Sequence, residues 1–341
     1  MARSLVVAPQ WIGDAVMAEP LLAELAERGE TLTVAALPWV APVLRAMPQV
    51  ADIIELPFAH GRLDWAARKQ LAATLRGRFE RAYVLPNSIK SALVPWLARI
   101  PVRVGYQGEG RWLLLNRRLP NPRDERPPMV AFYGALAGDG GVAPDARPRL
   151  SLPSATVLEA LARAQVRRGA YWVFAPGAEY GPAKRWPTEH FAALARQLYS
   201  QSLQPVLLLG SGKDGPVCDE ISLLAPGACR VMAGKTTLDE AMALIAAARG
   251  MVSNDSGLMH VAAGFDIPQA AVFGSTSPDH TPPHSPKSRV VWLKGELGLD
   301  CMPCFARECR YGHYRCLTEV SPERVGAALR EVLEGQPAPA R

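Results

Sequence analysis

The chain has 341 residues, of which 49% are hydrophobic and 21% charged, the composition of an ordinary globular protein long enough for two domains. No uncharged apolar stretch approaches the roughly 18 residues of a membrane span, and the amino terminus lacks the apolar region of a secretion signal, so we expect a cytoplasmic protein. The net charge is +6, and the segment from Arg62 to Arg123 alone holds 13 Lys and Arg against 3 Asp and Glu.

This basic segment favours an anionic partner, such as a nucleic acid, a phosphorylated lipid or a membrane. Its aromatic side chains are too scattered to form a platform for base stacking, and no nucleic-acid-reading motif accompanies them. We therefore expect a phosphorylated lipid or a membrane surface rather than a nucleic acid. A solvated basic face without any partner is the alternative.

Apolar runs alternate with helical patterns along the first 120 residues. Strands are expected at residues 4–9, 31–37, 51–57 and 81–86. A helix is expected from Asp14 to Gly29 with a kink at Pro20, and another between the third and fourth strands. This alternation predicts an open parallel sheet.

Residues 120–153 interrupt the alternation, because they are rich in Pro, Gly and charge and contain one modest helix around residues 129–137. A second series of strands follows at residues 171–177, 205–212, 229–234, 250–254 and 269–275. The sequence therefore predicts two α/β domains, residues 1–153 and 154–341. Such sheets bind ligands at the carboxyl ends of their strands, so a cleft is expected there.

Asp14 follows a glycine where the first predicted strand turns into the first helix. Aspartate is a preferred helix N-cap, because its carboxylate accepts hydrogen bonds from the unpaired N–H groups of the first turn. The same position would also hold a carboxylate at the mouth of the cleft, ready to take a proton. Both interpretations stay open on these residues.

The stretch "GSGKDG", Gly210 to Gly215, matches the G-x-G-x-x-G pattern of dinucleotide-binding loops. Such a site also needs an acid at the end of the next strand, and "RVMAG" offers none. We expect a glycine loop near a ligand, with Gly212 as a candidate contact. An NAD-dependent oxidoreductase is the alternative.

The stretch "SNDSGLMHVAAG" turns from a strand into a short helix. The backbone N–H groups of Ser256 and Gly257, at the start of that helix, would form an anion site. Because an acid there would repel a phosphate, Asp255 is expected to accept hydrogen bonds from sugar hydroxyls, with His260 on the same side of the helix. A capped turn and a core histidine are the alternatives.

The loop "PGAEYGPAKRWPTEHF" follows the first strand of the second domain and carries Lys184 and Arg185 just before a helix. These cations suit a diphosphate, with Lys184 as a point charge on its oxygens, although ordinary surface charges are the alternative. Three glycine-containing loops at strand ends, with Gly177 and Gly212 among their residues, point to a nucleotide diphosphate.

Four cysteines and a histidine fall in the short segment "CMPCFARECRYGHYRC". The C-x₂-C pair and the two further cysteines would suit a structural zinc, or reduced thiols would simply lie together. No catalytic metal is expected. The residues concerned are Cys301, Cys304, Cys309, Cys316 and His313.

Five stretches, taken in order, resemble the ADP-heptose–lipopolysaccharide heptosyltransferases of glycosyltransferase family 9. They are "PQWIGDAVMAEPLL", "LPNSIKSALVPWLARIPVRVGY", "PGAEYGPAKRWP", "SNDSGLMHVAAG" and "CMPCFARECRYGHYRCL". The resemblance covers nearly the whole chain. It implies a GT-B architecture, in which two Rossmann-like domains face each other across a cleft, with the donor in the C-terminal domain and the acceptor in the N-terminal one.

The resemblance also implies a reaction. Heptose would pass with inversion from ADP-L-glycero-β-D-manno-heptose to the first heptose of the lipopolysaccharide inner core, on a Kdo-lipid A anchor at the inner face of the inner membrane. No cofactor would be required, no nucleic acid would bind, and a monomer is expected. Addition of the first or third core heptose is the alternative within the family, and a non-catalytic nucleotide-binding protein is the alternative outside it.

Roles for single residues follow from the same resemblance. Asp14 would take the proton of the acceptor hydroxyl, and Gly13 would let the acceptor approach. Lys184 would neutralise the charge that develops on the departing diphosphate. The other donor contacts would be Gly177, Gly212, Asp255, Ser256, Gly257 and His260. The acceptor contacts on the loop after the fourth strand would be Asn87, Ser88 and Lys90.

Overall fold

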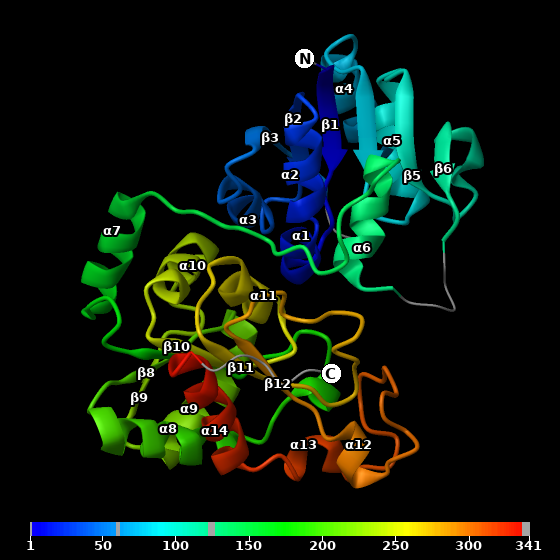
Figure 1. The fold of residues 1–341 in the computed structure, drawn as a ribbon. Coiled ribbons are helices and arrows are strands. Elements are labelled where there is room, and N and C mark those ends of the chain that lie inside the picture. Colours follow the sequence, from blue (N-terminus) through cyan, green and yellow to red (C-terminus); the bar gives the residue numbers. More distant parts are fainter. Residues whose placement is uncertain (1, 59–61, 122–126, 336–341) are drawn as a thin grey trace. The chain divides into compact units, whose positions relative to one another are not determined.

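The computed structural model describes residues 2–58, 62–121 and 127–335, and the chain forms two compact units, Met1–Ser151 (unit 1) and Leu152–Arg341 (unit 2) (Figure 1). Each unit is built on one six-stranded sheet whose strand pairs are all parallel. Among the described helices, none is both long and apolar enough to cross a membrane.

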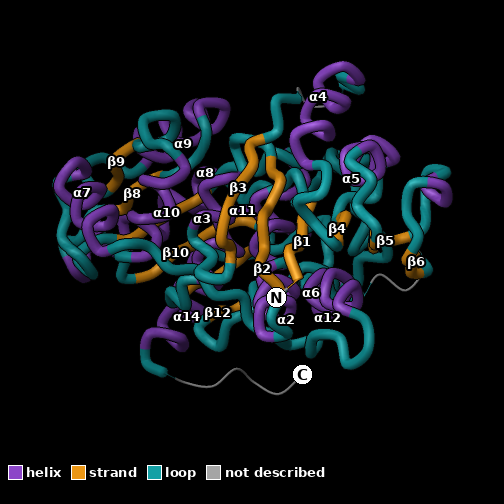
Figure 2. Tube along the Cα trace, turned by 90° about the horizontal axis from the view of Figure 1, so that it is seen from above, coloured by secondary structure: helices purple, strands orange, loops and turns teal. Residues whose placement is uncertain are grey.

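The sheet of unit 1 has the strand order β3-β2-β1-β4-β5-β6. Its strands are β1 (Ala2–Val7), β2 (Glu30–Ala36), β3 (Val50–Glu55), β4 (Arg81–Val84), β5 (Val102–Tyr106) and β6 (Arg117–Leu119). Its helices are α1 (Ile12–Met17), α2 (Glu19–Glu27), α3 (Ala41–Arg45), α4 (Trp65–Leu75), α5 (Ile89–Leu97), η1 (Arg111–Leu113), α6 (Met129–Gly134) and η2 (Ala135–Ala137). Figure 2 shows α4 and α5 on one side of the strands and α2 and α6 on the other.

The strand order of unit 1 reverses direction beside β1, so the loops after β1 and β4 diverge at the carboxyl edge of the sheet. Such a switch point is where open parallel sheets bind their ligands, because the diverging loops leave a crevice between them. The loop after β1 leads to Asp14, and the loop after β4 carries Asn87, Ser88 and Lys90. The topology therefore gathers the predicted residues of this unit at one edge.

The helix predicted from Asp14 to Gly29 is in fact two helices, α1 and α2, that meet at Ala18. Pro20 lies in the first turn of α2, where its missing N–H group costs no hydrogen bond, so the chain breaks rather than kinks. Helix α1 begins two residues earlier than predicted, with Trp11 as its N-cap. The N-cap interpretation of Asp14 is therefore wrong, since this residue lies inside the first turn.

The sheet of unit 2 has the strand order β12-β11-β10-β7-β8-β9 and reverses direction beside β7. Its strands are β7 (Trp172–Ala175), β8 (Val206–Leu208), β9 (Cys229–Val231), β10 (Gly250–Asn254), β11 (Gln269–Val272) and β12 (Ser288–Val291). Its helices are α7 (Ser154–Ala164), η3 (Pro182–Lys184), α8 (Thr188–Ser202), η4 (Gly212–Asp214), α9 (Gly215–Leu224), α10 (Leu238–Ala246), α11 (Gly257–Gly264), α12 (Lys294–Leu297), α13 (Arg315–Thr318) and α14 (Pro322–Leu333).

Alternate residues along the strands of unit 2 face two different layers of helices. Ala270 and Val272 belong to the core that α8, α9 and α14 cover, whereas Ala271 packs with Met259 of α11 on the opposite face (Figure 1). Burial on both faces explains why these strands are continuous apolar runs in the sequence. The switch point of this sheet lies between β7 and β10, which carry the two loops with Lys184 and Asp255.

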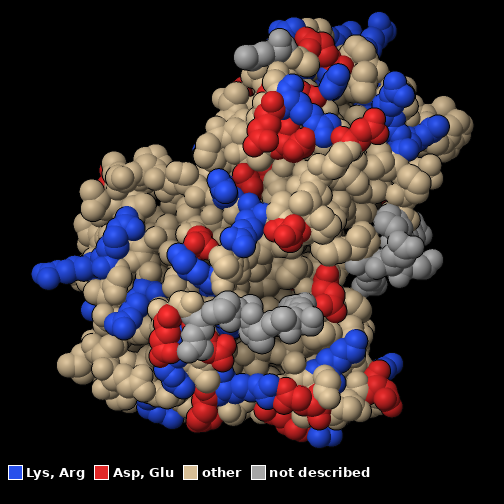
Figure 3. All heavy atoms as spheres, viewed as in Figure 1, with Lys and Arg blue, Asp and Glu red and all other residues tan. Residues whose placement is uncertain are grey.

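The basic segment of unit 1 is partly internal. Arg68 and Arg111 are only 8% and 1% exposed, and together with Arg103 they donate hydrogen bonds to backbone carbonyl oxygens. On the face that Figure 3 shows, Lys and Arg of unit 1 lie among Asp and Glu. Part of the positive charge of this segment therefore stabilises its own loops.

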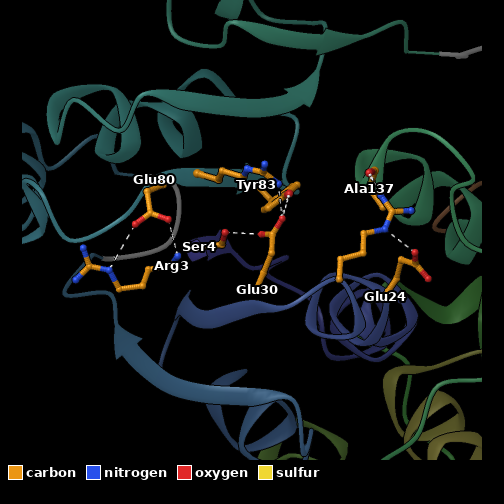
Figure 4. Close-up of polar contacts among 9 residues, drawn as sticks. Arg3, Ser4, Glu24, Glu30, Glu80, Tyr83 and Ala137 are labelled. Atoms are coloured by element: carbon orange, nitrogen blue, oxygen red, sulfur yellow. Dashed lines mark hydrogen bonds and ion pairs between the residues drawn. The ribbon is translucent and has the colours of Figure 1, made fainter. Parts of the chain in front are cut away.

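A buried carboxylate joins three strands at the amino edge of the sheet in unit 1 (Figure 4). Glu30 accepts hydrogen bonds from Arg81 Nη1 at 2.6 Å, from Tyr83 Oη at 2.9 Å and from Ser4 Oγ. Burial first, and then the charge of Glu30, raise the pKa of Tyr83 to about 12, so the phenol stays a proton donor. The network therefore links β1, β2 and β4 at the amino edge of the sheet through polar contacts.

We expect Glu30→Ala to lower the free energy of unfolding by about 2–4 kcal/mol, because it leaves buried donors on Ser4 and Tyr83 and a charge on Arg81 without their acceptor. Urea denaturation measures the loss. The matched control is Glu24→Ala, which removes a partly exposed pair with Arg28 and should cost under about 0.5 kcal/mol. Equal losses in the two variants would contradict a stabilising role for the network.

Candidate functional site

Three loops at the carboxyl edge of unit 2 meet at one carboxylate, that of Asp255. Lys184, at the end of η3, places its Nζ 2.5 Å from Asp255 Oδ2, and the two side chains are 15% and 4% exposed. Thr276, on the loop after β11, donates a hydrogen bond to the same oxygen at 2.6 Å. The Lys184 ammonium also lies 5.0 Å from the centre of the Tyr180 ring, within the range of a cation–π contact.

A single buried amide holds both ends of the loop that carries Lys184. Asn254 donates from Nδ2 to the carbonyl of Pro176 at 2.6 Å, and its Oδ1 accepts from the backbone N–H of Trp186 at 2.9 Å. The Trp186 ring packs edge-on against Phe191 at 4.8 Å between centroids. No local sequence pattern predicts this role of Asn254.

Helix α11 carries two buried polar groups near its start, the Ser256 hydroxyl and the His260 imidazole. Ser256 is its N-cap, yet the side chain makes no capping hydrogen bond, and Oγ is buried without a partner in the part of the chain that the structure describes. His260, one turn further, is 4% exposed, and burial lowers its pKa to about 4. The imidazole is therefore neutral at physiological pH, and Ser256 has an unused donor and acceptor.

The glycines of the two neighbouring loops make room for an acid rather than for a ligand alone. A Cβ atom on Gly177 would lie 2.3 Å from Asp214 Oδ1, and one on Gly210 would lie 2.8 Å from Asp214 Cβ. The carboxylate of Asp214 accepts hydrogen bonds from Ser211 N at 2.9 Å and from Ser211 Oγ at 2.8 Å. This capping box accounts for much of the "GSGKDG" pattern, whereas a Cβ on Gly212 would meet no atom within 4 Å.

In unit 1, Asp14 is half-buried and its Oδ1 accepts a hydrogen bond from Tyr133 Oη at 3.0 Å. Gly13, beside it in the first turn of α1, is buried. Burial first, and then the negative charge of Asp14, hold the pKa of Tyr133 well above its usual value. The structure thus gives Asp14 a protonated donor from a helix distant in the chain, which its local sequence does not reveal.

Buried arginines hold the loop after β4. Arg111 donates to the carbonyl of Pro86 at 2.6 Å and to Asn87 Oδ1 at 3.2 Å, so Asn87 is engaged within the protein. Arg68 donates from Nη1 to the carbonyl of Lys90 at 2.8 Å. Ser88 Oγ accepts from the backbone N–H three residues on and caps α5.

A hollow of about 640 Å³ lies in unit 1 at the carboxyl ends of β1, β2 and β4. Ser88 and Lys90 line it, whereas Gly13 and Asn87 do not. Its walls also carry Arg62 and Arg68, and among its described lining residues there is no Asp or Glu. Arg62 pairs with Asp64 at 3.6 Å, and the excess of cations over acids in the lining favours an anionic occupant.

The cysteine-rich segment packs against the loops of unit 2. Its four cysteines carry free thiols and line one hollow together with Ala183 and Ser275. Among the described residues, no three His, Cys, Asp or Glu side chains are arranged to hold a metal ion. Two backbone hydrogen bonds attach the segment to these loops. Arg307 O accepts from Ala183 N at 3.0 Å, and Phe305 N donates to Ser275 O at 2.7 Å.

Known proteins resemble this chain along almost all of its length. The family model described as glycosyltransferase family 9 (heptosyltransferase) matches residues 68–315. Lipopolysaccharide heptosyltransferase 2 of Salmonella typhimurium is 40% identical and aligns with 97% of this chain and 98% of its own. Lipooligosaccharide heptosyltransferase 2 of Haemophilus influenzae is 39% identical over 96% and 99% of the two chains.

A solved structure agrees with this likeness. The ADP-heptose lps heptosyltransferase II of E. coli superposes with a TM-score of 0.83 at 38% identity, covering 98% of this chain and 99% of the other. The predicted GT-B fold class is confirmed, and the NAD-dependent oxidoreductase is not favoured. A ligand cleft between the two units stays a prediction. With its family matched over most of its length and relatives near 40% identity along nearly all of it, the chain belongs to the heptosyltransferases of glycosyltransferase family 9.

Proposed function

We propose that this glycosyltransferase moves L-glycero-D-manno-heptose, with inversion, from ADP-heptose to the first heptose of the lipopolysaccharide inner core. The observation that carries the proposal is the 40% identity to a lipopolysaccharide heptosyltransferase 2 over 97% of the chain. The full-length relatives reported above share that designation. This favours the second core heptose as the sugar added, over the first or third.

The donor would bind at the carboxyl edge of unit 2. The Ser256 hydroxyl is buried and has no partner among the residues that the structure describes. This hydroxyl and the N–H of Gly257 at the start of α11 would donate to the diphosphate. A buried polar group without a partner is rare in folded proteins, because it costs free energy. A ligand that pairs with Ser256 would remove the cost of burying this hydroxyl unpaired. Gly212, exposed and with open space at its Cβ position, would border the donor, while Gly177 acts by making room for Asp214.

Lys184 would be the cation beside the leaving diphosphate. Asp255 and the Tyr180 ring hold its ammonium in place before any substrate arrives, so little reorganisation is needed when negative charge develops. Asp255 would also accept hydrogen bonds from the sugar, and the uncharged ring of His260 would still offer one N–H donor to the donor substrate. The transfer proposed in this way needs no cofactor.

The acceptor would bind at the carboxyl edge of unit 1. The hollow there, with Arg62, Arg68 and Lys90 in its walls, suits an anionic glycolipid such as heptose-Kdo-lipid A. We propose that Ser88 and Lys90 contact it directly and that Asn87 contributes through the loop that Arg111 holds. We propose that the protein works as a monomer attached peripherally to the inner face of the inner membrane, where it would meet such a lipid acceptor.

In the reaction, Asp14 would take the proton of the acceptor hydroxyl while that oxygen attacks the anomeric carbon of the donor. The bond between the anomeric carbon and the diphosphate oxygen breaks, and ADP leaves with the electron pair of that bond. Gly13, which has no side chain, would allow the acceptor to approach the carboxylate. One displacement of this kind inverts the anomeric centre.

We expect the wild-type protein to transfer heptose from ADP-heptose to Kdo-lipid A that carries one heptose, and to leave the heptose-free glycolipid unmodified. Mass spectrometry of the lipid product measures both. Transfer to the heptose-free glycolipid would assign the first heptose instead. Binding of ADP without transfer to either acceptor would indicate a non-catalytic nucleotide-binding protein.

We expect Asp14→Asn to lower kcat by about 10²–10⁴-fold, because the amide cannot take a proton. Its melting temperature and its affinity for ADP should stay unchanged, since the side chain keeps its size and its carbonyl can still accept from Tyr133. The control is Asp52→Asn on β3, which is exposed and outside the site. Retained activity in Asp14→Asn would remove Asp14 as the base.

The neutral state of His260 makes stability depend on pH. The folded-state pKa of about 4 lies below the unfolded value near 6.5, so the unfolded chain binds more protons between these limits. The contribution of neutral His260 to the free energy of unfolding is present above pH 6.5 and is lost as the pH falls towards 4. Between pH 7 and pH 5, we expect His260→Gln to lose about 2 kcal/mol less unfolding free energy than the wild type.

Urea denaturation at the two pH values tests this dependence on His260. The control is His313→Gln, which replaces an exposed imidazole and should lose as much stability between pH 7 and pH 5 as the wild type. The interpretation fails if His260→Gln and His313→Gln lose the same amount.

A further inference from the structure

One phenol on α6 reaches the carboxylate to which we assign the role of base. Tyr133 Oη donates to Asp14 Oδ1 at 3.0 Å across a separation of 119 residues in the chain. The tyrosine is only 5% exposed. The proposed reaction does not use the phenol.

The surrounding packing fixes the position of this phenol. Phe132 lies edge-on to the Tyr133 ring at 5.7 Å between centroids, and Tyr106 stacks on Phe132 at 3.9 Å. Tyr106 Oη in turn donates to the carbonyl of Phe132. A Cβ atom on Gly134 would lie 2.5 Å from Val142 Cβ, so the end of α6 packs closely against Val142.

We propose that Tyr133 is a positioning residue for Asp14, whose hydroxyl holds one carboxylate oxygen so that the base keeps a single orientation and stays ionised during turnover. The proposal rests on the proposed function, in which Asp14 is the base. Tyr133 itself exchanges no proton and touches no reacting atom. Its effect on the reaction passes through the carboxylate.

A hydrogen bond donated to a carboxylate favours the ionised form, because the protonated form accepts it less well. Burial and the charge of Asp14 keep the pKa of Tyr133 well above its usual value, so the phenol remains a donor across the working pH range. Removing the hydroxyl therefore raises the pKa of Asp14. A larger share of the enzyme then carries a protonated, inactive base at acidic pH.

Other titratable groups lie on the helices packed against α1. Arg45 on α3 pairs with Glu55, and Tyr106 lies beyond Phe132. The acids on α2 are engaged elsewhere or exposed: Glu19 accepts from Gln49 and Arg149, Glu24 pairs with Arg28, and Glu27 is exposed. All of them are retained in Tyr133→Phe, so a change in the pH profile of that variant reports the lost hydroxyl.

The test is Tyr133→Phe in the full chain, with kcat and kcat/KM measured against pH. We expect kcat to fall roughly tenfold near neutral pH, KM for ADP-heptose to stay constant, and the acidic limb of kcat/KM to move to higher pH by about one unit. The matched control is Tyr106→Phe, which removes a hydroxyl from the same aromatic cluster. That variant should melt at a lower temperature and keep the wild-type acidic limb.

A loss in Tyr133→Phe that is the same at every pH would overturn the proposal, because a merely structural tyrosine acts in that way. A second check is the pair Asp14→Asn and Asp14→Asn/Tyr133→Phe, whose residual rates should be equal. Activity retained in Asp14→Asn would instead overturn the role of Asp14. An inactive Asp14→Asn beside a wild-type pH profile in Tyr133→Phe would overturn this inference alone.

Discussion

The arrangement of the loops at the carboxyl edge of unit 2 depends on the buried carboxylate of Asp255. Burying a charge is costly unless it is paired, and here an ammonium and a hydroxyl on two other loops both reach Oδ2. Lys184 and Thr276 can do so only if the loops after β7, β10 and β11 converge. The amide of Asn254 and the backbone of the cysteine-rich segment stabilise that arrangement through hydrogen bonds to the same loops. A donor site at this edge depends on this convergence.

In unit 1, buried arginines rather than a buried carboxylate hold the loops at the carboxyl edge of the sheet together. Arg111 ties the loop after β4 to its neighbours through carbonyl oxygens, and Arg68 does the same from α4. Part of the basic excess is thus structural, while Arg62, Arg68 and Lys90 still line a hollow without a described acid. One arginine, such as Arg68, can hold a loop in place and also make a cavity positively charged. Composition alone therefore does not separate these two roles.

Which loops carry the site follows from the sequence, because parallel strands end at one edge and the loops after them are visible as breaks between apolar runs. Partners distant in the chain are not visible in this way. Tyr133 lies 119 residues from Asp14, and Asp214 explains Gly177 only in three dimensions. Strands β5, β6 and β12 are not predicted from the sequence. Strand β6 has only three residues, two of them arginines, so it lacks the apolar run that marks central strands.

The central claim is a single displacement assisted by Asp14, and the anomeric configuration of the product tests it most directly. The one-bond coupling between C1 and H1 of the transferred heptose, measured by NMR on the lipid product, distinguishes the two anomers. From a β-linked ADP-heptose the account predicts an α-linked heptose. A β-linked product would contradict it, because retention requires a double displacement or attack from the same face as the leaving group, and not the single inverting displacement assigned to Asp14.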